Sequence, residues 1–247
     1  MKILVINPNL TKAVTDAVAA VARRYAAPGT EILAVTGEFG PQVIGSRAEN
    51  ALAHHGVLEL AAKHHDGCDA VVLGVSLDTA LLALREILPI PVVGMTEAGL
   101  YGAALVATKI GVLTFGSRMV PAYEEIVKAY GLATRVVGVD SVELPPTATF
   151  SDPKAVRELT LEACHRLIAQ GAEAVVMAGA AMAGLNETLQ GDMPVPLVDG
   201  VACAVPLAEM LVRLKLPKPS AGSLAHPGVR SVHGVSPELA ALFAPKR

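Results

Sequence analysis

The 247-residue sequence contains no tryptophan, and aromatic side chains make up only 3% of it. Proteins that bind single-stranded nucleic acid stack the bases on such side chains, so the chain offers little for a stacking surface. Lysine and arginine form no long runs, and the formal net charge is -3. Because nucleic-acid binding needs concentrated positive charge, we expect no nucleic acid among the partners.

Long apolar runs and paired cysteines are missing too. Although 52% of the residues are hydrophobic, no apolar run reaches the roughly 18 residues that span a bilayer. The first apolar run, 3–6, is far too short for a secretion signal. The cysteines, Cys68, Cys164 and Cys203, are odd in number and lack the spacing of a metal site. We therefore expect a cytoplasmic protein with reduced thiols and no membrane contact.

Sequence signatures of bound cofactors are also absent. His54 and His55 are neighbours, as are His64 and His65, and adjacent residues on a helix point to different faces. Neither pair is therefore suited to chelating one ion, and we expect no metal. No Gly-x-Gly-x-x-Gly follows a predicted strand, so we also expect no dinucleotide or other cofactor.

What the sequence does contain is an internal repeat. Residues 69–74 read Asp-Ala-Val-Val-Leu-Gly, and residues 173–178 read Glu-Ala-Val-Val-Met-Ala. The other matching segments are 90–94 with 195–199 and, more weakly, 2–7 with 109–114. A match in this order predicts two similar α/β halves with a ligand in the cleft between them.

Short, continuous apolar runs alternate with helical spacing along the chain, which is typical of parallel strands covered on both faces. We expect strands at about 2–6, 31–35, 70–74, 91–94, 110–114, 135–139, 174–178 and 196–198. We expect helices at about 11–26, 48–66, 80–88, 98–106, 119–130, 152–170 and 201–213. Thr11 is expected to cap the first helix, and Ser151 or Asp152 the helix that begins at about 152. The pattern predicts an α/β fold of parallel sheets flanked by helices, with functional loops at the carboxyl ends of the strands.

The repeat also predicts the domain limits. Residues 1–97 form the first half, and residues 98–213 form the second. Residues 214–247, rich in Pro, Gly and Ser until Pro237 opens a short helix, are expected to be an arm packed on the first half.

Polar and small residues follow the predicted strands at one edge of each sheet. The candidate substrate-binding residues are Asn7, Asn9, Thr79, Thr114, Ser117, Arg118 and Met182. Backbone N–H groups at such strand-to-helix junctions, here in 76–79 and 180–183, are free to hold a carboxylate or an imide oxygen. The alternative for the polar side chains is that they only cap helices.

Four further residues are candidates for chemistry. Ser76 could donate a hydrogen bond to a developing enolate. Asp78, Asp199 and Glu97 could act as general bases if burial raises the pKa of their carboxyl groups toward neutrality. The alternative for each carboxylate is that it stabilises the positive end of a helix. Arg118 could bind a carboxylate with its guanidinium fork.

The segments that carry these residues resemble signature stretches of hydantoin racemases, in the aspartate/glutamate racemase superfamily. The stretches are 5–9, 91–94 with 97–98, 182–185 and 198–202. The resemblance covers nearly the whole chain. It implies two Rossmann-like halves related by a pseudo-two-fold axis and a cofactor-free site between them. In that family two cysteines face each other across the substrate, where one thiolate removes a proton and the other thiol returns one.

The chain departs from that pattern at the two cysteines. Matching the flanking residues places Val75 and Gly179 where they belong, and neither side chain can carry a proton. Our leading hypothesis is a cofactor-independent, racemase-like isomerase that acts on a hydantoin-like cyclic amide or a small carboxylate and lacks both family cysteines. We also expect a homo-oligomer.

Two alternatives stay open. The first is a lyase, decarboxylase or hydrolase that uses Ser76 with a carboxylate, because 74–76 partly resembles the Gly-Thr-Ser oxyanion stretch of arylmalonate decarboxylase. That enzyme, however, needs a cysteine at the position of Gly179. The second is a non-catalytic binding protein, or a chain from which the cysteines were removed.

Overall fold

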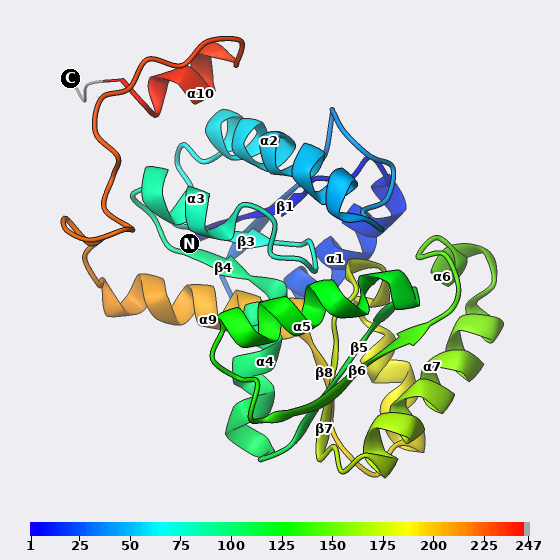
Figure 1. The fold of residues 1–247 in the computed structure, drawn as a ribbon. Coiled ribbons are helices and arrows are strands. Elements are labelled where there is room, and N and C mark those ends of the chain that lie inside the picture. The colour runs from blue at the N-terminus through cyan, green and yellow to red at the C-terminus, as the bar shows by residue number, and fades with distance from the viewer. Residues whose placement is uncertain (245–247) are drawn as a thin grey trace.

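The computed structural model describes residues 1–244, so the end of the C-terminal arm, 245–247, lies outside the described residues. Two four-stranded parallel sheets carry the same strand order, β2-β1-β3-β4 and β6-β5-β7-β8 (Figure 1). The strands are β1 Lys2–Asn7, β2 Glu31–Thr36, β3 Ala70–Leu73, β4 Val92–Gly94, β5 Ile110–Phe115, β6 Val136–Val142, β7 Ala174–Met177 and β8 Leu197–Asp199. The predicted α/β fold with two equivalent halves is confirmed.

Helices connect the strands and cover both sheets. They are α1 Lys12–Tyr25, α2 Arg47–His64, α3 Leu81–Ile87, α4 Met95–Val106, α5 Val120–Ala129, α6 Ala148–Ser151, α7 Pro153–Ala169, α8 Leu185–Leu189, α9 Gly200–Leu214 and α10 Pro237–Ala241. Three 3₁₀ turns are η1 Ser117–Met119, η2 Ala180–Met182 and η3 Gln190–Asp192. The sequence predicts the long helices but not α6 or α8, because four or five residues are too few to show a helical period.

The predicted cap at Thr11 is wrong, and of the two candidates for the second cap it is Asp152, not Ser151, that caps the helix. Asp152 does cap α7, since its carboxylate accepts a hydrogen bond from the Ala155 N–H at 3.1 Å. Thr11 precedes α1 without a side-chain cap, because its hydroxyl instead donates to the Gln42 carbonyl oxygen at 2.7 Å. Thr11 therefore anchors the 42–46 loop rather than the helix.

The strand registers give the halves equivalent residues. The pairs that occupy matching places are Leu73 with Met177, Asn7 with Thr114, and Gly94 with Asp199. Val75 and Gly179 each lie two residues beyond the last residue of β3 and β7, respectively. The two positions that the resemblance assigns to cysteines are thus equivalent in the fold.

The halves meet along α4 and α9. A Cβ on Gly200, at the start of α9, would lie 2.3 Å from the carbonyl oxygen of Met95, so only glycine permits this close approach. Helix α4 packs against β7, whereas α9 packs against α1 and β3. Each helix therefore follows one sheet in the chain and packs against the other sheet. The domain limit predicted near residue 213 follows the sequence repeat, and it stays a prediction.

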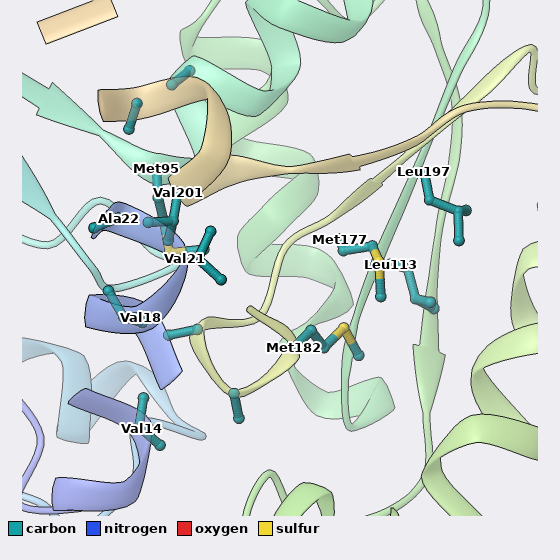
Figure 2. Packing of buried hydrophobic residues seen from close by; sticks show 14 of the residues in the cluster. Val14, Val18, Val21, Ala22, Met95, Leu113, Met177, Met182, Leu197 and Val201 are labelled. Atoms are coloured by element: carbon teal, nitrogen blue, oxygen red, sulfur yellow. The ribbon is translucent and has the colours of Figure 1, made fainter. Parts of the chain in front are cut away.

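One hydrophobic cluster continues from the first half into the second. Figure 2 shows Val14 and Val18 of α1 on one side of the view and Leu113, Met177 and Leu197 of the second sheet on the other, with Met182 between them. A shared core of this kind holds the two sheets at a fixed distance and leaves their carboxyl ends facing a common space.

The C-terminal arm contacts helices α2 and α3. Helix α10 lies against α2, and the Ser236 N–H donates to Glu59 Oε1 at 3.0 Å (Figure 1). Farther back along the arm, Lys218 Nζ donates to the Leu88 carbonyl oxygen at 2.9 Å, at the end of α3. Over residues 1–244, no helix is both long enough and apolar enough to cross a membrane.

Candidate functional site

A cavity of about 220 Å³ lies between the halves, where loops at the carboxyl ends of strands from both sheets come together. Its apolar wall consists of Val14, Val43, Ile44, Val75, Phe115, Met119, Leu144, Pro145 and Pro146. Its polar side chains are Asn9, Ser76, Thr114, Arg118, Tyr123 and Thr147, and small residues, among them Gly179, Ala180 and Ala181, complete it. An apolar space with a few convergent polar groups is typical of a small-molecule site.

Four of the predicted site residues line this cavity: Asn9, Ser76, Thr114 and Arg118. The side chain of Asn9 is held by its amide oxygen, Oδ1, which accepts a hydrogen bond from the Thr11 N–H at 3.0 Å. Its amide nitrogen has no partner in the described chain and is free to donate. Arg118 is exposed at the cavity and makes no ion pair within the described residues, so its guanidinium is available to an anion.

Two other predicted residues lie behind the cavity wall. Asn7 is fully buried, and its amide donates to Asn9 Oδ1 at 3.0 Å and to Thr15 Oγ1 at 2.9 Å. Thr79 is also buried and donates to Asn50 Oδ1 at 2.7 Å. Asn7 therefore supports the cavity by orienting Asn9, while Thr79 fixes the loop that follows β3 to α2.

Ser117 and Met182 are placed away from the cavity wall as well. The Ser117 N–H donates to Glu143 Oε1 at 2.7 Å on the exposed side of η1. Met182 is fully buried in the shared core. None of Asn7, Thr79, Ser117 and Met182 lines the cavity within the described residues. That they bind substrate directly stays a prediction, and their positions do not favour it.

Tyr123 of α5 is a residue of the candidate site that sequence reasoning missed. It lines the cavity, and its hydroxyl donates to Ser76 Oγ at 2.6 Å, across the two halves. Burial raises the pKa of Tyr123 to about 12, so the phenol stays protonated at neutral pH. One signal was present, since Tyr123 and Tyr130 lie seven residues apart and therefore on one face of the helix predicted at 119–130.

Residues that line the cavity in both halves have free backbone N–H groups. Those of Ser76, Ala180 and Ala181 donate no hydrogen bond within the described part of the chain. By contrast, the N–H groups of Asp78 and Met182 donate within their own turns, at 3.0 and 2.7 Å. The two loops predicted from the sequence thus contribute three free donors that can hold a carbonyl oxygen or an oxyanion.

The predicted general bases lie outside the cavity lining. Asp199 caps α9, with Oδ1 accepting the Val201 N–H at 2.7 Å. Asp78 is 5% exposed and accepts hydrogen bonds from backbone N–H groups of α4. Burial raises the pKa of the Asp78 carboxyl to about 7, against the effect of these donors and of Tyr130. The catalytic roles of both aspartates stay predictions, and both carboxylates already serve as helix caps.

The third carboxylate considered, Glu97, forms an ion pair with Arg85 of α3, at 3.0 and 2.6 Å. The two side chains are only partly accessible to solvent, and neither lines the cavity. This bidentate pair joins α3 to α4 beneath the loop that carries Ser76. Because both carboxylate oxygens of Glu97 accept hydrogen bonds from Arg85, this side chain is not a free general base.

Residues 3–208 match the family model of Asp/Glu/Hydantoin racemase. The chain belongs to this family. A hydantoin racemase from Pseudomonas sp. (strain NS671) is 34% identical over 216 residues, which are 87% of each chain.

Solved structures agree with the membership in this racemase family. Allantoin racemase from Klebsiella pneumoniae superposes with a TM-score of 0.92 at 34% identity, over 97% of this chain and 98% of that one. Allantoin racemase from Pseudomonas fluorescens gives 0.91 at 34% identity, over 95% of this chain and all of the other (100%). The resemblance deduced from the sequence is thereby confirmed for the fold and the family.

Thiols are absent from the cavity of this racemase-family protein, as far as the described residues go. Val75 and Gly179 line it, whereas the three cysteines do not. Burial raises the pKa of the Cys164 thiol to about 12 and that of Cys203 to about 11, so both stay protonated. Within the described lining, Arg118 is the ionisable group that is charged at neutral pH, and no carboxylate or imidazole joins it. Among residues 1–244, no group of three or more His, Cys, Asp or Glu side chains is placed to hold a metal ion.

Proposed function

We propose that this protein is a racemase-type isomerase that binds a small cyclic amide of the hydantoin type, or a small carboxylate, in the cavity between the halves. We further propose that it stabilises the enolate of this substrate with hydrogen-bond donors instead of exchanging protons through thiols. The observation that carries the proposal is that residues of both halves with free N–H groups or hydroxyls line one cavity.

The donor set suits a ring that carries carbonyl groups. The N–H groups of Ala180 and Ala181 lie opposite the Ser76 loop in the fold and are suited to a ring carbonyl on one side of the substrate. Ser76 Oγ, already accepting from Tyr123, retains its own proton to donate to an enolate oxygen. One such donor contributes roughly 3 kcal/mol to a developing oxyanion, so two or three would lower the barrier substantially. The names of the relatives, hydantoin racemase and allantoin racemase, support a cyclic amide as the substrate.

The absence of a neutral-pH base from the described lining restricts the substrate. Tyr123 is protonated, and the serine and threonine hydroxyls are weaker bases than a thiolate. Water must then accept the proton, so the C–H bond of the substrate must itself be acidic, as it is between two carbonyl groups. Gly179 leaves one side of the cavity without a functional side chain, where a water molecule is a suitable proton carrier.

Deuterium exchange tests this proposal. The purified protein is incubated in D₂O with unsubstituted hydantoin and with a cyclic amide whose C–H is flanked by two carbonyls, and exchange is followed by proton NMR. We expect exchange above the buffer rate, stronger for the more acidic substrate. Ser76→Ala should lower kcat/KM by roughly 100-fold. The matched control is Ser231→Ala, which removes an exposed hydroxyl outside the cavity lining.

A second function is favoured by the same lack of a base. Loss of CO₂ from a malonate-type acid leaves the electrons of the broken C–C bond on the substrate as an enolate, so no base is needed, and water then supplies the proton that the enolate takes up. Val43, Ile44 and Leu144 give the cavity an apolar wall that would desolvate the departing carboxylate. Release of CO₂ from a malonate-type acid, without deuterium exchange into hydantoin, would identify a decarboxylase and contradict the isomerase.

A homo-oligomer is part of the proposal, and analytical ultracentrifugation of the purified protein measures the oligomeric state.

A further inference from the structure

The loop that carries Ser76 has an unusual backbone. Asp78 and Ala80, in the loop between β3 and α3, have φ angles of +47° and +63°. Residues with a Cβ rarely adopt this left-handed conformation, which costs free energy and persists only where other contacts compensate for it. The loop therefore requires a set of contacts that hold it in place.

The side chain of Asp78 provides such contacts. Its Oδ1 accepts the Thr96 N–H at 3.0 Å, and its Oδ2 accepts the Glu97 N–H at 2.8 Å. These N–H groups belong to the first turn of α4, so the carboxylate caps that helix. Thr96 completes the connection, since its hydroxyl donates to the Ser76 carbonyl oxygen at 2.6 Å. The start of α4 and the Ser76 loop are thus joined in both directions.

The second half caps its equivalent helix differently. There Asp199, the last residue of β8, caps α9 from its own strand end. The equivalent residue of the first half is Gly94, and a Cβ on it would lie 2.3 Å from Asp78 Cγ. In the first half the capping carboxylate therefore belongs to the loop that bears Ser76 and not to the strand end. Asp199 also accepts the Gly184 N–H at 2.7 Å, at the end of the cavity loop that follows β7, so both caps are tied to a loop at the cavity, but only Asp78 is itself part of the loop that it holds.

Helix α5 of the second half holds the same loop from the opposite side. Tyr123 donates to Ser76 Oγ at 2.6 Å, and Tyr130 donates to Asp78 Oδ2, also at 2.6 Å. Tyr123 lies in α5 and Tyr130 directly follows its last residue, Ala129, so their two hydroxyls fix two points of one loop across the interface between the halves. Any displacement of Asp78 would therefore disturb the contact between Tyr123 and Ser76.

We propose that Asp78 is a positioning residue of the site: its buried carboxylate, bonded to the start of α4 and to Tyr130, holds Ser76 against Tyr123 at the cavity. Asp78 does not touch the substrate. The inference rests on the proposed function only in assigning Ser76 and Tyr123 to the substrate, since the positioning itself is a property of the folded protein.

Tyr130→Phe and Asp78→Asn test the positioning directly. The protein has four tyrosines and no tryptophan, so the Cζ signals of ¹³C-labelled tyrosine can be assigned by single Phe replacements. We expect both variants to shift the Tyr123 signal. The matched control is Tyr25→Phe, because Tyr25 also donates to a carboxylate across the halves, that of Glu187 at 3.4 Å, but outside the cavity lining. The control should leave the Tyr123 signal unchanged.

Kinetics of deuterium exchange with hydantoin supply the second measurement. Tyr130→Phe should lower kcat roughly ten- to 100-fold and change KM less than about twofold, because Ser76 is misplaced while the other binding groups are retained. An unchanged Tyr123 signal in both variants would reduce Asp78 to a helix cap and overturn the proposal. A shifted signal with undiminished kcat would overturn it as well. If the unmodified protein shows no exchange, the proposed function fails, and the Tyr123 signal still decides whether Asp78 positions Ser76.

Discussion

Introducing cysteines at positions 75 and 179 tests whether two missing thiols separate this protein from thiol-dependent racemisation. Val75 is 4% exposed, and replacing it with the slightly smaller cysteine should cost about 1 kcal/mol of stability. Gly179 has a φ of -150°, which any residue adopts, so its replacement causes no backbone strain. A Cβ there would lie 3.2 Å from Met182 Cγ and 3.4 Å from Phe115 Cδ2.

These contacts are tight, but Met182 has a flexible side chain that can move by a few tenths of an ångström. Overpacking of this kind costs roughly 1–3 kcal/mol, so the double variant should lose about 2–4 kcal/mol in total. A domain with typical stability of about 5–15 kcal/mol remains folded after such a loss. We therefore expect the variant Val75→Cys with Gly179→Cys to be folded and assayable, with a lowered Tm.

The expected gain is in proton exchange. A positioned acid or base contributes roughly 10²–10⁴ in rate, and a cysteine thiolate is a strong base at accessible pH. Racemisation of 5-substituted hydantoins should be negligible in the unmodified protein, and exchange of the C5 proton should rise at least about 100-fold in the double variant. Proton NMR in D₂O measures exchange, and polarimetry measures racemisation. Thiol alkylation should abolish the gain and leave any activity of the unmodified protein intact.

Each single replacement is a control, because one thiol can remove and return a proton on one face without inverting the carbon. Val75→Cys alone and Gly179→Cys alone should therefore give exchange with little racemisation. C5 exchange into 5-substituted hydantoins by the unmodified protein as fast as that of the double variant would refute the reasoning and direct attention to Asp78, Asp199 or Glu97 as the base.

Three further changes test the supporting structure. Asn7→Ala removes a buried donor to Thr15 Oγ1 and should lower the free energy of unfolding by about 1–3 kcal/mol in urea denaturation; an unchanged midpoint would contradict the buried network. Gly94→Ala places a Cβ 2.3 Å from Asp78 Cγ and should lower Tm, whereas Gly191→Ala, with open space around its Cβ, should not. Burial raises the pKa of the Asp78 carboxyl to about 7 from 3.8, so between these pH values the folded protein keeps a proton that the unfolded chain has released. The free energy of unfolding should then fall by up to about 4 kcal/mol as the pH rises from about 4 to 7, and a pH-independent difference between wild type and Asp78→Asn would contradict this.

The strands and the two halves could be predicted because their sequence signals are local. The run 70–73 is continuous and apolar, and its counterpart 174–177 repeats it, so both the buried parallel strand and the duplication are visible without a structure. Packing between the halves leaves no such signal. That α9 follows the second sheet in the chain but packs on the first depends on the close approach of Gly200 to Met95, which no periodicity reveals.

Only part of the candidate site could be predicted, and the two asparagines that end β1 and follow it show why. Strand-end reasoning identified both Asn7 and Asn9, but it cannot tell which side chain faces the cavity and which lies behind it. The structure places Asn9 on the wall and Asn7 behind it as its support. Tyr123 was missed because it reaches the cavity from the body of a helix, and a search confined to strand ends does not include such residues.

Asp78 and Asp199 show that equivalent places in a repeat need not carry equivalent chemistry. Both carboxylates bind the first-turn N–H groups of a helix, so the physical requirement, a negative charge at the positive end of a helix, is the same in each half. The residue that meets it differs, because Gly94 occupies the strand end where Asp199 stands in the other half. Once the carboxylate sits in the loop after β3, the cap also determines where Ser76 lies. A repeat therefore predicts which interactions a fold must satisfy, whereas the structure is needed to show which of them also shape the site.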